Sequence, residues 1–368
     1  MADRVLGLRE LNRATLARQM LLERETLPVP AAIERLVGLQ AQLAQPPYVG
    51  LWTRLRDFRR DDLADLIESR AVVKATLMRG TLHLFTAADY IRFRAGLQPT
   101  LSAGWSSIAK RRGADFDLDK LLTAARRYIG EAPRTFAEIS AWVVELMPDN
   151  DVGAMRLGVR THLPLVQVPS GAGWSYSSKP AFTLAEAWIG QPIAPEDNLP
   201  ELLLRYLAAF GPASVTDAQA WLGLPNLKDR FEELRPQLQR YRDQQRRELF
   251  DLPDRPLPAD DIRAPARFLP EFDNLLLSHS KRTRVIADEY RSRVYLPGLR
   301  VAATILVDGF VRGVWKIEKA KNAATLVIEP FETLAKPDRT ALAEEGQRLI
   351  RFVEPQARSF DLRFAEPD

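Results

Sequence analysis

The sequence predicts an α+β protein built from three tandem winged-helix units, a helix-turn-helix variant, followed by a mostly β C-terminal region. Three observations support this: an early run of three helices and a hairpin, an internal repeat, and a change of texture after about residue 255. A winged helix places helices and a hairpin against DNA. The expected units span residues 1–112, 113–195 and 196–256, and the C-terminal region spans residues 257–368, packed on the third unit.

The first unit shows the element order expected of a winged helix. Apolar residues at helical spacing predict three helices. Two extended runs follow, and the segment between them predicts a hairpin with Arg79 at its tip, where a phosphate contact is expected. The expected helices span residues 8–24, 30–42 and 61–69, and the expected strands span residues 71–76 and 81–85.

The pattern recurs further along the chain. Residues 133–142 and 212–221 share a proline, a Thr or Ser, an apolar residue, an acid and Ala-Trp in register, an offset of 79 residues. The first copy is followed by an expected helix at 152–162 and a hairpin at 165–177. The second is followed by an expected helix at 226–239 and a charge-rich hairpin at 240–251.

Prolines punctuate a connector after residue 255, and strand-like segments then follow. Asp308-Gly309 predicts a tight type I′ turn between two of them. A helix over about 339–353 and a final strand complete the C-terminal region. The expected strands include residues 272–277, 301–307, 310–314 and 358–364.

Composition excludes several classes of function. The 368 residues, 46% hydrophobic and 27% charged, are typical of a soluble protein with two or three domains. No apolar run reaches the length of a membrane span and no signal peptide is evident, so we expect a cytoplasmic protein. Cysteine is absent, and the three histidines lack ligand spacing, which predicts no metal site. No glycine-rich phosphate loop suggests a nucleotide, so no cofactor is expected.

Two glutamines, in Gln40-Ala41-Gln42, are the candidate catalytic residues. Gln40 continues the apolar stripe of the expected helix, and an unpaired buried amide costs about 1–3 kcal/mol, so it should be hydrogen-bonded or lie on the floor of a cleft. Gln42 is rotated well away from Gln40 on an ideal helix. Both face one cavity only if the helix ends or loosens before Pro46-Pro47. The alternative is a capped helix end with two surface amides.

A second candidate patch is basic. Net charge is only +4, but most basic residues are arginines, which suit phosphates and guanine edges. His279, Lys281, Arg282 and Arg284 lie between strand-like segments and predict a hairpin that contacts DNA. An ordinary solvated loop is the alternative.

Several motifs together resemble one known family, the AlkZ and YcaQ group of winged-helix DNA glycosylases. The resemblance covers nearly the whole chain and is specific only in combination. The motifs are Leu39-Gln40-Ala41-Gln42, Tyr48-Val49-Gly50-Leu51-Trp52, Arg79-Gly80-Thr81-Leu82-His83-Leu84, Phe210-Gly211-Pro212, the segment 269–279 and Val307-Asp308-Gly309.

The resemblance implies a C-shaped array of three winged helices around a basic channel, and hydrolytic removal of bulky N7-alkylated purines. Gln40 and Gln42 match the Gln-x-Gln motif of the AlkZ branch, whereas the YcaQ branch has an acidic second residue. Members of the AlkZ branch also unhook crosslinks and protect antibiotic producers. The implied function is therefore DNA repair, with interstrand crosslinks and self-resistance to a genotoxic natural product as further expectations.

The chemistry of such a substrate suits amides. An N7-alkylated guanine carries a positive charge and leaves without protonation, so the enzyme has only to position water and stabilise an oxocarbenium-like sugar. We expect Gln40 to position the water and Gln42 to support it or contact the sugar, although the roles could be reversed. No lysine lies in the motif, which predicts a monofunctional enzyme.

The expected partner is double-stranded DNA that contains alkylated purines, bound by a monomer in a bacterial, nucleoid-associated setting, without a protein partner. Two alternatives stay open. A winged-helix transcription regulator would need no catalytic glutamines and is usually a dimer. A damage-binding protein without activity would bind alkylated DNA and release no base.

Overall fold

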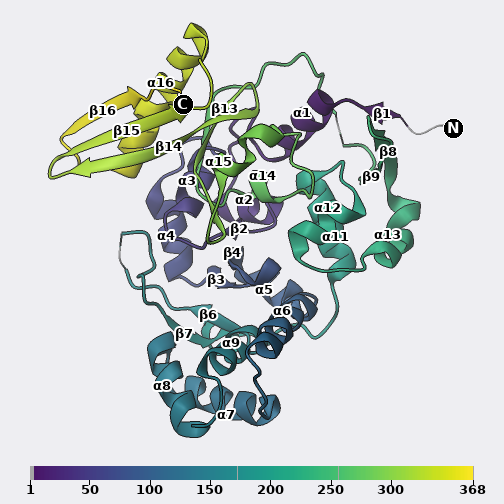
Figure 1. Ribbon diagram of the computed structural model, residues 1–368, viewed down its shortest axis with the longest axis vertical. Helices are drawn as coiled ribbons and strands as arrows, with labels where there is room; N and C mark the ends of the chain where they lie inside the picture. The colour runs from purple at the N-terminus through teal and green to yellow at the C-terminus, as the bar shows by residue number, and fades with distance from the viewer. Residues whose placement is uncertain (1–3, 172, 256, 368) are drawn as a thin grey trace.

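The computed structural model describes residues 4–171, 173–255 and 257–367 and shows an α+β protein, as the sequence predicts. Its central sheet has six strands in the order β2-β4-β3-β6-β7-β5 (Figure 1). The strands are β2 (Leu39–Gln40), β3 (Val72–Thr76), β4 (Leu82–Thr86), β5 (Arg134–Thr135), β6 (Leu165–Gln167) and β7 (Ala181–Leu184). Ala75 pairs with Val166, so the hairpins of the first and second segments of the chain form one continuous sheet.

The first segment contributes most of the helices around this sheet. They are α1 (Leu8–Arg18), α2 (Val29–Arg35), α3 (Pro46–Trp52), α4 (Arg60–Glu68), the 3-10 turn η1 (Met78–Gly80), α5 (Ala87–Phe93) and α6 (Gln98–Arg111). The predicted hairpin is confirmed as β3 and β4, paired antiparallel.

The helix predicted over 30–42 is wrong in its second half. Helix α2 ends at Arg35, and the chain then turns through Val37 and Gly38, whose φ angles are 54° and 81°. A Cβ on Gly38 would lie 2.0 Å from the ring of Phe85, so only glycine fits there. The apolar spacing through Gln40 therefore belongs to two different elements that share one core.

The second segment has the order helix, short strand, two helices, hairpin. Its helices are α7 (Leu118–Glu131), α8 (Phe136–Leu146) and α9 (Val152–His162), with α10 (Ala185–Ile189) after β7. The internal repeat marks equivalent helix starts. Thr135 caps α8 with Glu138, and Ser214 caps α12 with Asp217, each as a reciprocal capping box.

The third segment repeats the helical part with a different hairpin. It contains α11 (Leu199–Phe210), α12 (Val215–Leu222), α13 (Lys228–Leu234), the turn η2 (Arg235–Gln237), β8 (Gln239–Asp243) and β9 (Glu248–Asp251). The predicted hairpin at 240–251 is confirmed, but the helix expected over 226–239 is shorter. Strand β1 (Val5–Leu6) from the N-terminus pairs with β8, so the first and third segments share a sheet.

The C-terminal region is a five-stranded sheet covered by one long helix. The strand order is β10-β13-β14-β15-β16. The elements are β10 (Arg267–Leu269), α14 (Asn274–Leu277), η3 (Asp288–Tyr290), α15 (Arg291–Val294), β11 (Tyr295–Leu296), β12 (Arg300–Val301), β13 (Thr304–Val307), β14 (Phe310–Ala320), β15 (Ala323–Pro330), α16 (Lys336–Val353) and β16 (Ser359–Phe364). The Asp308-Gly309 turn is confirmed between β13 and β14. The strand expected at 272–277 is instead a turn and α14, because Asp273 caps that helix.

This region packs against the first segment as well as against the third, on which the sequence analysis placed it. Leu16 and Leu21 belong to its core, and Val49 joins the core beneath α16. Arg54 of the first segment and Asp273 of the C-terminal region also form a bidentate ion pair, with both N–O distances 2.8 Å and both side chains almost fully buried. No helix in the described part of the chain has the length and apolar character needed to cross a bilayer.

The buried pair predicts a large loss of stability when one partner is removed. Asp273→Asn leaves the Arg54 guanidinium buried without its carboxylate, so we expect the free energy of unfolding to fall by about 3–5 kcal/mol. The matched control is Arg127→Gln, which breaks an exposed pair with Glu131 and should change it by less than about 1 kcal/mol. Urea unfolding of the three proteins checks this, and equal losses in both variants would contradict it.

Candidate active site

Gln40 and Gln42 lie at the edge of the central sheet, on an extended segment rather than a helix. Gln40 pairs with His83 of β4, and Ala41 continues the pairing by donating its N–H to the Leu82 carbonyl at 2.7 Å. Alternate residues of an extended segment face the same side. Gln40 is the last residue of β2 and is buried, whereas Gln42 is exposed at the bend that follows the strand, so both amides lie at this edge without any loosening of a helix.

The carboxamide of Gln40 is held by a cation. Arg79 donates from Nη2 to Gln40 Oε1 at 2.7 Å. Because a guanidinium only donates, this contact fixes which end of the amide is oxygen. Gln40 Nε2 consequently points away from Arg79, and no hydrogen bond from it to another described residue is recorded. The bond is charge-assisted, a stronger class than neutral hydrogen bonds.

Arg79 does not extend from a wing tip as the sequence suggested. It sits in η1 with φ of 55°, and its guanidinium turns inward, where Nη1 donates to the carbonyl of Trp221. Burial, with a smaller contribution from the nearby Arg282, lowers the pKa of Arg79 to about 10. The side chain is still a cation at neutral pH, and it links the Gln40 strand to α12.

His83, opposite Gln40 on β4, is a buried neutral imidazole. Its Nδ1 donates to the carbonyl of Thr81 at 3.0 Å, so Nε2 carries the lone pair, and Nε2 is buried without a partner among the described residues. Burial, and then the charge of Arg79, lower the pKa of His83 to about 3. The alternation of His83 with Leu82 and Leu84 predicts a wing residue that points away from the core, and its burial shows that this prediction is wrong.

Asn274 was missed as a positioning residue. Its Nδ2 donates to the carbonyls of Gly38 at 2.6 Å and Leu36 at 3.3 Å, while its Oδ1 accepts from the N–H of Gln40 at 3.4 Å. One side chain thus bonds both sides of the turn that ends α2. The Asp273-Asn274 pair in the sequence indicated a local turn, but nothing local indicated a partner more than two hundred residues away.

The basic segment 279–284 divides into interior and accessible residues. His279 is 1% exposed, donates from Nε2 to the Phe210 carbonyl at 3.0 Å and accepts at Nδ1 from Ser278, and burial lowers its pKa to about 3. Arg284 is 3% exposed and donates to the carbonyl of Pro212 and to Thr15. The His279 side chain is used inside the fold and does not fit the DNA contact predicted for it, whereas Arg284 bonds only to neutral oxygens of the fold and also lines a small pocket.

Lys281 and Arg282 are the accessible members of this segment. Lys281 is exposed, and Arg282 is half-buried with its guanidinium 4.1 Å from the ring centre of Tyr295. Arg282 also lies close enough to Arg79 to lower the pKa of that residue. The predicted motif and the predicted basic patch therefore meet beside Gln40.

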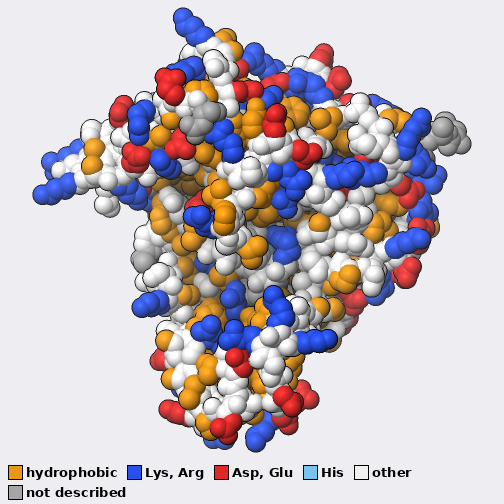
Figure 2. All heavy atoms as spheres, viewed as in Figure 1, with side chains coloured by type: hydrophobic (Ala, Val, Ile, Leu, Met, Phe, Trp, Pro, Cys, Tyr) orange, Lys and Arg blue, Asp and Glu red, His pale blue; other side chains and the backbone are white. Residues whose placement is uncertain are grey.

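Further arginines, which sequence analysis did not single out, lie on α9. Arg160 donates from Nε to Thr76 Oγ1 at 3.0 Å, which ties α9 to the end of β3. Arg112, Arg156 and Arg160 line one cavity of about 340 Å³ between α6 and α9. Figure 2 shows Lys and Arg side chains gathered over this part of the molecule and above it, toward α14 and α15.

Within the described residues, no group of three or more His, Asp or Glu is arranged to hold a metal ion.

Comparison with known proteins gives a consistent result. The chain matches the family model described as DNA glycosylase AlkZ-like over residues 33–352. It is 26% identical over 361 residues to the interstrand DNA cross-link repair glycosylase of Streptomyces sahachiroi, which covers 91% of this chain and 93% of that protein. The solved structure of the S. sahachiroi DNA glycosylase AlkZ has the same fold, with a TM-score of 0.81 at 22% identity over 98% of this chain and all of that one. The resemblance found in the sequence is confirmed.

The neutral state of His83 predicts a pH-dependent stability. Its folded pKa is about 3 and its unfolded pKa about 6.5, so the unfolded chain takes up a proton first as pH falls. The contribution of His83 to the free energy of unfolding is therefore fully present above pH 6.5 and is lost as pH falls toward 3. Between pH 7 and pH 5 this one group should lower the free energy of unfolding by about 2 kcal/mol. His83→Asn, which keeps a donor for Thr81, should remove that part of the pH dependence.

Chemical unfolding of the wild type and His83→Asn at pH 7 and pH 5 measures this difference. The control is His162→Asn, because His162 is less buried and its pKa is lowered less. Equal pH dependence in the wild type and His83→Asn would show that His83 takes up its proton in the folded protein.

Proposed function

Because the chain belongs to the AlkZ-like DNA glycosylase family, we propose that it hydrolyses the N-glycosidic bond of bulky N7-alkylated purines in duplex DNA. The observation that carries this proposal is the pair of amides at the sheet edge, Gln40 and Gln42, with Gln40 oriented by the half-buried guanidinium of Arg79. No carboxylate among the described residues bonds to Gln40, Gln42 or Arg79. The pKa of Arg79 is shifted by burial and by the charge of Arg282, and no acidic residue contributes to that shift.

When no carboxylate bonds to the catalytic amides, the charge of the leaving base determines which substrates can react. Most glycosidases use one carboxylic acid to protonate the leaving group and a second carboxylate to stabilise the sugar or activate water. A base that is already cationic needs no acid. Amides then have only to orient water and present dipoles to the developing sugar cation, and such fixed dipoles act strongly where water is excluded. The site should therefore favour N7-alkylated purines over neutral damaged bases.

The geometry supports a division of labour between the glutamines. Gln40 Oε1 uses one lone pair on Arg79 and keeps a second one for the attacking water. Gln42 Oε1 accepts from the N–H of Leu82 at 3.3 Å, so its amide N–H groups are directed outward to hold the water or contact the sugar. Both amides are fixed through their oxygens by donors of the protein, which reduces the reorganisation needed at the moment of reaction.

The proposed DNA-binding scaffold is the array of three winged helices over 1–112, 113–195 and 196–256, with the region 257–368 completing the site. The order of helices and hairpins, the repeated capping boxes and the likeness to the S. sahachiroi fold support it. Three such units in one chain suit a monomer that surrounds a duplex. In this proposal Lys281 and Arg282 contact the DNA.

The wider role follows from the relative. Since the S. sahachiroi protein is named an interstrand DNA cross-link repair glycosylase, we include interstrand crosslinks among the substrates. Self-resistance to a genotoxic natural product, which the resemblance to the AlkZ branch implies, and action on genomic DNA at the bacterial nucleoid are part of the same proposal. Membership of a glycosylase family disfavours the transcription regulator. The remaining alternative is a protein that binds damaged DNA without releasing a base, and measurements of activity distinguish it from the glycosylase.

The first test is release of base from a duplex with a single N7-alkylguanine under single-turnover conditions. Gln40→Ala removes the amide that orients the water, so we expect the rate constant to fall by about 10²–10³. Gln42→Ala should lower it by about tenfold or more. Binding to the same duplex should persist in both variants, because neither removes a charge.

The control for this test is Gln347→Ala, at a half-buried position of α16 where the amide bonds only to Arg351 of the same helix, which should leave the rate unchanged. If the wild type released no base from any N7-alkyl lesion, the damage-binding alternative would remain.

Borohydride should trap no covalent complex between enzyme and DNA, because the proposed reaction uses water. A trapped complex would show a bifunctional enzyme and would direct attention to Lys74, whose pKa burial lowers to about 8.

A second test separates Arg79 from a simple phosphate contact. Arg79→Met removes the donor that orients Gln40, so the rate constant for base release should fall by about tenfold to a hundredfold. Arg79→Lys keeps the charge but loses the planar fork that reaches both Gln40 and Trp221, and should recover little activity. The affinity for duplex DNA should change less than the rate in both variants. A phosphate contact would give the reverse: weaker binding, a normal rate and good rescue by lysine.

A further inference from the structure

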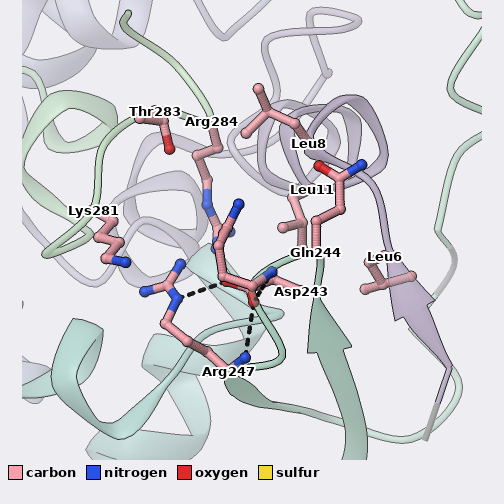
Figure 3. A pocket seen from close by; sticks show the side chains of 10 residues that line it. Leu6, Leu8, Leu11, Asp243, Gln244, Arg247, Lys281, Thr283 and Arg284 are labelled. Carbon is pink, nitrogen blue, oxygen red and sulfur yellow. Dashed lines mark hydrogen bonds and ion pairs between the residues drawn. The ribbon is translucent and has the colours of Figure 1, made fainter. Parts of the chain in front are cut away.

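A small pocket lies where the N-terminal segment, the β8–β9 turn and the loop 279–284 meet (Figure 3). Its volume is about 180 Å³. The residues that line it are Leu6, Leu8, Leu11, Asp243, Gln244, Gln245, Arg247, Lys281, Thr283 and Arg284. Three cations thus border it against one carboxylate, and Figure 3 shows Arg284 directed toward the β8–β9 turn with Lys281 and Arg247 beside it.

The single carboxylate pairs with one of these cations, Arg247, and leaves the other two without it. Asp243 Oδ1 accepts from the N–H groups of Gln245 and Arg247, both at 2.9 Å, and Oδ2 accepts from Arg247 Nε at 2.6 Å. Its oxygens therefore close the β8–β9 turn and hold Arg247 at the rim. Lys281 forms no ion pair with any described residue, so its charge has no protein counter-ion.

Arg284 is the deepest of the cations and also lacks a direct ion pair within the described residues. Its recorded bonds are to the neutral oxygens of Pro212 and Thr15. The nearest acid that affects it, Asp217, spends its oxygens on Ser214 and Ser280. Burial lowers the pKa of Arg284 most; the charge of Asp217 raises it in part, and the charge of Arg247 lowers it. Burying a guanidinium without a partner is costly, and an anion in the pocket would offset that cost.

We propose that this pocket binds one phosphodiester group of the DNA backbone, gripped by Lys281 and Arg247 with Arg284 behind them. The Thr283 hydroxyl at its wall can donate to the same group. Lys281 directly precedes Arg282, the residue that lies beside the Arg79–Gln40 pair. The phosphate is therefore on the strand that passes the glutamines, a placement that rests on the proposed function. The pocket also gives the β8–β9 turn and the loop 279–284 a shared role.

The test uses the whole protein and an undamaged duplex, so that it does not depend on base release. Affinity is measured from low to moderate salt, where each neutralised phosphate contributes about 0.9 to the slope of log K against log salt concentration. The variant Lys281→Gln combined with Arg247→Gln should lower that slope by about one and weaken binding at least tenfold at low salt. Lys281→Arg should bind as the wild type does.

The matched control is Lys120→Gln, which removes an exposed lysine without a recorded ion pair from α7 and should leave the slope unchanged. An unchanged slope in the double variant would overturn the proposal, and so would binding of inorganic phosphate that needs Lys281 while duplex binding does not. That last result would assign the pocket to a free anion rather than to DNA.

The placement is tested separately on a duplex with a stable abasic analogue, which fixes the register. Single methylphosphonates, which lack the charge, are introduced along each strand near the analogue. We expect one position at which the neutral linkage weakens wild-type binding but does not weaken the double variant further. A normal change in slope without such a position would retain the pocket as a phosphate site and count against the proposed location of the glutamine site.

Discussion

The turn at Val37 and Gly38, and the Asn274 side chain that bonds across it, are the constraint on which the site depends. Without that turn α2 would continue, and Gln40 and Gln42 would face different directions. Gly38 is required because the ring of Phe85 occupies the space of any Cβ. Asn274 satisfies the carbonyls that the end of the helix leaves open and also receives the N–H of Gln40. The C-terminal region thus completes a site whose reactive residues belong to the first fifty residues.

The first segment and the C-terminal region each contribute one cation that the described part of the fold does not neutralise directly. Arg79 bonds to a carbonyl and an amide, and Arg284 bonds to a carbonyl and a hydroxyl, each without a direct carboxylate partner among the described residues. Such charges lower the stability of the free protein. In the proposed complex, the phosphate bound in the pocket supplies the anion that Arg284 lacks, so part of the binding energy is set aside in the fold. In the same proposal, the phosphates that flank the lesion reduce the repulsion between its positive charge and the nearby arginines.

The sequence predicted some of these features and missed others for identifiable reasons. The β3–β4 hairpin, the Asp308-Gly309 turn and the repeated helix starts are local, because strand alternation, turn residues and capping pairs act within a few positions. The helix through Gln42 was wrong because two successive elements bury the same core and imitate one stripe. Gly38 was the local signal for the break. The inward positions of Arg79, His279 and Arg284 depend on partners such as Trp221, Phe210 and Pro212, and no spacing in the sequence reports those contacts.

The position of the motif bears on how an enzyme of this kind accepts a bulky lesion. Strand β2 is at one end of the sheet order, and Gln42 is exposed there, so the amides sit on an open edge rather than inside a sheet. An enclosed pocket that receives a flipped base must match its size. An open edge places no such limit on the adduct, and in the proposed reaction selectivity rests on how readily the cationic base leaves. The proposal then requires that the DNA strand itself, held by its phosphates, position the lesion relative to Gln40. An open site of this kind would therefore need both a rigid phosphate contact, which positions the strand, and a pair of oriented amides, which act on the bond to be cleaved.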